Sequence, residues 1–109
     1  MKKFKFQLET LLKVTRMNKD KAEVELAKAT QNLEEQRQLL KQYLEDMAKG
    51  QKDYDEITAK GGITVGTLMT FNSFFNWKRT QIEQQQQAIL KAQSERQARL
   101  KELVAVVNK

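Results

Sequence analysis

An apolar seam with unbroken four-three spacing constrains the fold of this chain more than any other feature. Alternate steps of four and three residues from Leu8 to Ile57 reach fifteen positions, of which eleven are apolar. The positions are Leu8, Leu12, Thr15, Lys19, Ala22, Leu26, Ala29, Leu33, Gln36, Leu40, Tyr43, Met47, Gly50, Tyr54 and Ile57. A seam held this long indicates a coiled coil, because the apolar stripe of an ordinary straight helix would drift around its axis. At 1.5 Å per residue the helix is roughly 75 Å long, which is too long for a compact globule.

The seam stops at residues 58–66, which contain three of the four glycines and so the main helix-breaking signal. Thr64 is placed to cap the start of a second helix. A second seam of twelve positions then begins, of which eight are apolar. Its positions are Leu68, Phe71, Phe75, Lys78, Ile82, Gln85, Ile89, Ala92, Arg96, Arg99, Leu103 and Val106.

Two seams joined by a short turn predict an all-α fold, in which two long helices form an antiparallel coiled-coil hairpin. We expect one domain over residues 1–109, with helix 1 at about 4–57, a turn at about 58–64 and helix 2 at about 65–107. The second helix is about ten residues too short to cover the first. We therefore expect a chain that is truncated at its C-terminus.

A turn centred on the paired glycines also predicts which residues face each other. It places Gly50 and Met47 opposite Phe71 and Phe75, where the missing side chain of Gly50 would make room for a ring. It places Gln36 opposite Gln85, where a buried polar pair would fix the register at some cost in stability. The alternative is that both features are accidental imperfections of the seam.

Composition argues against enzymatic chemistry. The chain has no histidine and no cysteine, which removes the commonest general base and the commonest metal ligands. The acidic clusters lie among lysines in helical spacing, where solvated charges are the usual role, and no glycine-rich phosphate loop is present. We therefore expect no catalytic residue, no metal site and no cofactor. The chain also lacks the apolar run of a signal peptide or a membrane span.

Positive charge collects near the two ends of the chain. Residues 1–21 carry seven basic against two acidic side chains, and residues 91–109 carry five against two. Since a hairpin brings its ends together, we expect its open end to bind an acidic partner. The candidate residues are Lys2, Lys3, Lys5, Lys13, Arg16, Arg96, Arg99 and Lys101. Nucleic acid is the less favoured partner, because Glu9 and Asp20 interrupt the basic segment.

Half of the aromatic residues lie between Phe71 and Trp77. Phe71 and Phe75 are seam positions, and we expect them to be core residues. Phe74 and Trp77 form a second stripe beside the seam, which a two-helix hairpin leaves at least partly exposed. With Lys78 and Arg79 they have the composition of a protein-binding hot spot. The alternative is that the two rings broaden the core or pair in a homodimer.

The opening FKFQLETLLKVTRMNKDKAEVELAKA and the later segment GGITVGTLMTFNSFFNWKRTQIEQQ together resemble the FliJ family of the bacterial flagellar type III export apparatus. The first segment has the aromatic-basic-aromatic start and the leucine-rich heptads of the family. The second has its glycine-containing turn, followed by an aromatic residue, two polar residues and Phe74. The resemblance spans the whole chain.

This resemblance implies a cytoplasmic, non-enzymatic stalk or chaperone that associates peripherally with the inner-membrane export apparatus. Its basic open end would engage the hexameric export ATPase, and it would also handle substrate chaperones. A surface at Phe74, Trp77, Lys78 and Gln81 would contact the export gate membrane protein FlhA. Because Lys78 and Gln81 are polar, an apolar contact there would rely on the two aromatic rings. The alternatives are an injectisome stalk protein of the YscO kind and a structural coiled coil that forms a weak homodimer.

Overall fold

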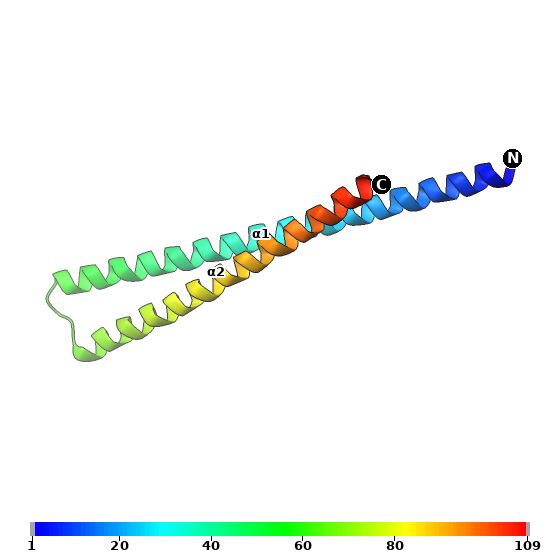
Figure 1. The fold of residues 1–109 in the computed structure, drawn as a ribbon. Helices are drawn as coiled ribbons and strands as arrows, with labels where there is room; N and C mark the ends of the chain where they lie inside the picture. The colour runs from blue at the N-terminus through cyan, green and yellow to red at the C-terminus, as the bar shows by residue number, and fades with distance from the viewer. Residues whose placement is uncertain (1, 109) are drawn as a thin grey trace. The chain divides into compact units, whose positions relative to one another are not determined.

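A computed structural model of the chain describes residues 2–108, with side chains from residue 3 onward. It contains two helices, α1 (Lys2–Ala59) and α2 (Val65–Val107), and no strand within the described part (Figure 1). The all-α, two-helix hairpin that the heptad seams predict is confirmed. Helix α1 extends slightly beyond its predicted range at both ends, and α2 has the predicted bounds.

The connection between the helices is short because each of its ends carries a capping signal. Gly61 adopts a left-handed φ of 71°, and its N–H donates to the carbonyl of Thr58 at 3.0 Å. A residue with a side chain would be strained in this conformation, which explains the glycine. At the start of α2, the hydroxyl of Thr64 accepts a hydrogen bond from the N–H of Thr67 at 3.1 Å. Thr64 is therefore the N-cap that the sequence predicts.

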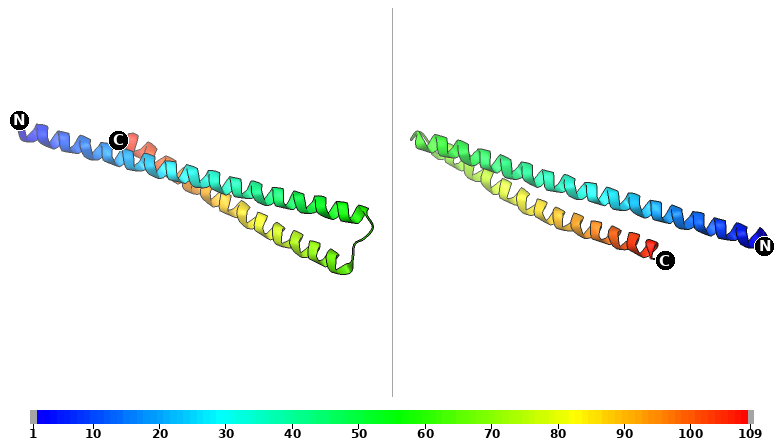
Figure 2. Two further views of the ribbon diagram at one scale, coloured as in Figure 1. Left: turned by 180° about the vertical axis from the view of Figure 1, so that it is seen from behind. Right: turned by 90° about the horizontal axis from the view of Figure 1, so that it is seen from above.

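The chain divides into two compact units, each built from a segment of both helices. Residues 35–90 form what we call the turn unit, and residues 2–34 with 91–108 form the terminal unit. Within each unit the segments of α1 and α2 run in opposite directions (Figures 1 and 2). Each unit is described below by itself.

Aromatic side chains hold the turn unit together near the turn. The Tyr54 ring packs edge-on against Phe71, with centroids 5.3 Å apart, and against Phe75 at 6.2 Å. Farther along, the side-chain amide of Gln85 donates to the backbone carbonyl of Gln36 at 2.8 Å and to its side-chain oxygen at 2.7 Å. The polar pair predicted from the register is therefore present, and Gln85 is buried.

Small and aliphatic side chains form the interior of the terminal unit. Ala29, Leu33 and Ala92 are buried, and small residues in this position allow two helices to approach closely. Helix α1 continues beyond the end of α2, as the blue segment does past the red end in Figure 1 and both views of Figure 2. Leu8 and Leu12 of the seam consequently remain 45% and 58% exposed.

Candidate partner-binding site

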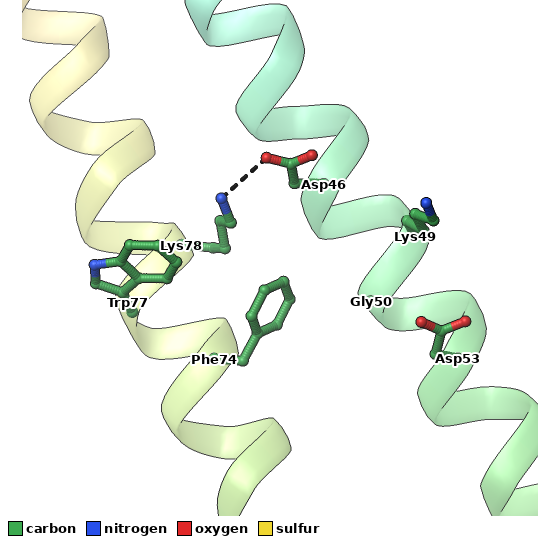
Figure 3. Close-up of a pocket in the computed structure, with 7 residues that line it drawn as sticks. All are labelled: Asp46, Lys49, Gly50, Asp53, Phe74, Trp77 and Lys78. Carbon is green, nitrogen blue, oxygen red and sulfur yellow. Dashed lines mark hydrogen bonds and ion pairs between the residues drawn. The ribbon is translucent and has the colours of Figure 1, made fainter.

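A hollow of about 290 Å³ opens beside the helix pair of the turn unit (Figure 3). It is lined by Asp46, Lys49, Gly50, Asp53, Phe74, Trp77 and Lys78. Helical spacing explains this set: the α1 residues recur at intervals of three and four, and so do the α2 residues, so each group lies on one helix face.

Gly50 provides the space into which Phe74 packs. A Cβ added at Gly50 would overlap Phe74 Cε1 and lie 3.1 Å from its Cζ, so only glycine leaves room for this ring. The prediction that Phe71 or Phe75 would occupy this space is wrong, since both pack on Tyr54 instead. Phe74 lies beside the seam, and the missing side chain of Gly50 leaves space for its ring between the two helices. Its ring is half-buried and meets Phe75 edge-on at 5.5 Å.

Lys78 is buried, with 6% of its surface exposed, although it carries a charge. Its ammonium donates to the Asp46 carboxylate at 3.1 Å, as the dashed line in Figure 3 shows. It also lies 5.2 Å from the ring centroid of Tyr43 and 4.7 Å from that of Trp77. Lys78 is therefore not exposed beside the two rings, and its role as a partner contact stays a prediction. Its seam position turns it toward α1, where a carboxylate and aromatic faces compensate its burial.

The Asp46 carboxylate is held in its charged form by its neighbours. The hydrogen bond from Lys78 lowers the pKa of Asp46 below the usual 3.8, and a second bond from the Gln42 amide at 3.0 Å acts in the same direction. Desolvation opposes both effects but does not outweigh them. Asp46 is therefore ionised at neutral pH, where it pairs with Lys78.

Trp77 is the exposed member of the aromatic pair, with 57% of its surface accessible. The buried Lys78 ammonium lies over its ring in a cation–π contact, 4.7 Å from the centroid. Gln81, one turn further on, is half-buried, and its Oε1 is buried without a hydrogen-bond partner among the described residues. Of the four predicted contact residues, Trp77 and part of Phe74 face outward, whereas Lys78 and Gln81 are largely taken into the helix pair.

The eight basic residues predicted to bind the acidic partner divide into those with a partner inside the chain and those that are exposed without one. Lys2 lies outside the residues whose side chains are described. Arg96 is half-buried and donates to the Thr30 hydroxyl at 3.1 Å. Arg99 pairs with Glu102 and Glu95, and the bond to Glu102 is the main cause of its raised pKa. The five that are exposed and have no ion pair within the described part are Lys3, Lys5, Lys13, Arg16 and Lys101.

Asp46 is the residue of the turn-unit site that sequence reasoning missed. With its acidic neighbour Glu45 it belongs to one of the acidic clusters whose helical spacing predicts solvated charges. A charged seam residue, Lys78, was the available signal, because a lysine facing another helix needs an acid within reach on that helix. Asp46 lies next to the seam position Met47 and satisfies this need.

Comparison with models of known protein families gives a match. The model of the family described as flagellar FliJ protein matches residues 4–109, which is nearly the whole chain. No curated protein and no solved structure matches. No helix within residues 2–108 has a stretch long and apolar enough to cross a membrane.

Proposed function

Because the chain belongs to the flagellar FliJ protein family, which gives it a role related to flagellar protein export, we propose that it acts as a non-enzymatic coupling component of that apparatus. In this proposal the terminal unit binds the hexameric export ATPase, and the turn unit binds the export gate protein FlhA. The protein would work in the cytoplasm, at the inner-membrane export apparatus. The observation that carries the gate contact is the exposed Trp77 beside the half-buried Phe74.

The two rings have the physical character of an interface anchor. Trp77 offers a large apolar surface, and its cation–π contact with Lys78 favours one orientation of the indole, which would lower the entropy lost on binding. The hollow beside it has an aromatic wall and carries the Asp53 carboxylate at its edge. A partner that inserts an apolar side chain there would cover both rings.

The test of the gate contact is binding of the cytoplasmic part of FlhA to the wild type and to Trp77→Ala, measured by titration calorimetry. We expect the variant to lose about 2 kcal/mol of binding free energy, or roughly thirtyfold in affinity. Met69→Ala is the matched control, because Met69 is exposed on the same helix of the turn unit but does not line the hollow. Equal affinity of Trp77→Ala and wild type would refute the gate contact.

The ATPase contact is supported by the five exposed basic side chains of the terminal unit. Binding there would favour one state of the ring only through a difference in affinity between states. We expect the wild type to raise ATP hydrolysis or the hexamer fraction, and Lys13→Glu/Arg16→Glu to abolish the effect. Lys41→Glu/Lys52→Glu reverses two exposed charges of the turn unit and is the control. No stimulation by wild type at micromolar concentration, or the same loss in both variants, would contradict this contact.

The alternatives make different predictions. The matching family is that of a flagellar protein, which favours the flagellar apparatus over an injectisome stalk. A structural homodimer would bury Trp77 between two copies, so sedimentation would show a dimer that Trp77→Ala dissociates. The handling of substrate chaperones stays a prediction, since no described surface is specific to them.

A further inference from the structure

Lys78 carries a buried charge at a position where stability alone would favour an apolar residue. It occupies a seam position of α2, and 6% of its surface is exposed. A buried ion pair is often no more stable than apolar side chains of similar size, because both charges lose their hydration. The pair of Gln36 and Gln85 already gives the turn unit a buried polar contact of the kind that fixes register. Neither stability nor register therefore explains a lysine here.

One carboxylate holds the Lys78 ammonium inside a cluster of aromatic rings. The ammonium donates to Asp46 Oδ2 at 3.1 Å, which joins α2 to α1. It lies 5.2 Å from the ring centroid of Tyr43, 5.9 Å from that of Phe74 and 4.7 Å from that of Trp77. All three distances are within the range of a cation–π interaction. Trp77 is the nearest of these rings, and it is the exposed one of the three.

The contact between Lys78 and Trp77 is unusual for neighbours on a helix. Side chains at successive positions point about 100° apart around the helix axis and do not normally face each other. Here the end of the lysine chain is fixed by Asp46, and the indole lies alongside it (Figure 3). The Asp46 carboxylate is itself held by a hydrogen bond from the Gln42 amide at 3.0 Å. A chain of contacts therefore runs from Gln42 and Asp46 on α1 to Trp77 on α2.

We propose that Asp46 is a positioning residue for Trp77: through Lys78 it holds the indole in the orientation that the partner binds. This inference rests on the proposed contact of the turn unit with FlhA, and it adds a residue of the other helix to those that control that contact. Asp46 acts without touching the partner, since both its carboxylate oxygens accept hydrogen bonds within the chain. Without the ion pair, Trp77 would stay exposed but turn more freely, so more entropy would be lost on binding.

The first test is Lys78→Met, which removes the cation and keeps a long unbranched chain in the seam. We expect this variant to be at least as stable as wild type in urea, because an apolar side chain replaces a buried charge and the Asp46 carboxylate, 36% exposed, stays hydrated. We nevertheless expect the cytoplasmic part of FlhA to bind it about fivefold more weakly. Stability and affinity then move in opposite directions, which a purely structural ion pair does not predict. Lys78→Arg keeps the cation and should retain most of the affinity.

Double variants separate positioning from direct contact with the partner. If Asp46 and Lys78 act through Trp77, Asp46→Asn and Lys78→Met should each weaken FlhA binding in the wild type and have no further effect in a Trp77→Ala background. A loss of affinity that persists in that background would show a direct contact and overturn the positioning role. Asp46→Asn leaves the buried ammonium without its carboxylate, so circular dichroism checks its helices. If they are lost, Lys78→Met alone decides the comparison.

Trp77 is the only tryptophan, so its fluorescence reports the motion of the indole without any partner. In Lys78→Met and Asp46→Asn the decay of its emission anisotropy should gain a faster component. Lys52→Met, at an exposed lysine of the turn unit that does not line the hollow, should leave the decay unchanged. If FlhA does not bind the wild type, the gate contact is refuted, and this fluorescence comparison alone decides whether Asp46 and Lys78 hold the indole. An unchanged anisotropy decay in both variants would overturn the inference, as would an unchanged FlhA affinity of Lys78→Met.

Discussion

Gly50→Ala tests whether the space left by a missing side chain holds Phe74 in place. In an ordinary helix interior the substitution stabilises by about 1 kcal/mol, because alanine loses less backbone entropy. Here the added Cβ overlaps Phe74 Cε1, and Phe74 Cδ1 is only 3.2 Å away, so the ring has to move. Overpacking of this kind costs about 1–3 kcal/mol. The net expectation is a destabilisation of about 0–2 kcal/mol.

The double variant separates the two contributions. In a Phe74→Ala background the ring is gone, so Gly50→Ala should recover its full gain of about 1 kcal/mol. The coupling between the two sites is then about 1–3 kcal/mol, and urea unfolding followed by circular dichroism measures it. Gly66→Ala is the control, because an added Cβ there meets only the Thr64 hydroxyl, at 3.9 Å. If Gly50→Ala stabilises the wild type as much as the Phe74→Ala variant, the packing argument is refuted.

Three further predictions concern the polar groups of the turn unit. Asp46 has a lowered pKa in the folded state, so the stability that it contributes is present above the ordinary pKa of 3.8 and is lost as the pH falls below it. Acid unfolding curves should therefore be steeper for wild type than for Asp46→Asn. Parallel curves would contradict this. Gln81→Leu should raise the free energy of unfolding by about 1 kcal/mol, because it removes a buried oxygen without a partner, and a loss of stability in urea would show that this oxygen is satisfied. Gln36→Leu/Gln85→Leu should keep or slightly raise the melting temperature, but it should allow other helix registers or oligomers, which sedimentation would detect. A single monomeric species would show that the pair does not specify the register.

Helix positions were predictable from the sequence because a single seam per helix dominates the pattern. The four-three spacing is sufficient to bring Gln36 opposite Gln85, at a position where both helices are regular. Thr64 and Gly61 mark the turn for local reasons, a side-chain cap and a left-handed backbone conformation. These features depend on near neighbours or on a repeated period, and both can be read from one sequence.

The candidate site was less predictable because it depends on side chains that lie beside the seam. Heptad positions say that Lys78 faces α1, but not that a carboxylate from a flanking position reaches it. Heptad positions also leave open which ring occupies the space at Gly50, since Phe74 and Phe75 are adjacent in sequence and the orientation of each ring decides the outcome. Such choices are made by the lateral packing of long side chains, which the period of the sequence does not encode.

The shallow interior of both units has a consequence for how binding can be detected. No large side chain is fully buried in the described part of the chain, so each helix pair is held by one layer of contacts. Amide hydrogen exchange should therefore be fast and graded along both helices, with local opening well below the cost of global unfolding. A ligand that binds either unit of the folded protein adds to its free energy of unfolding. The melting temperature of the protein alone is then a sensitive, label-free measure of whether a partner has bound.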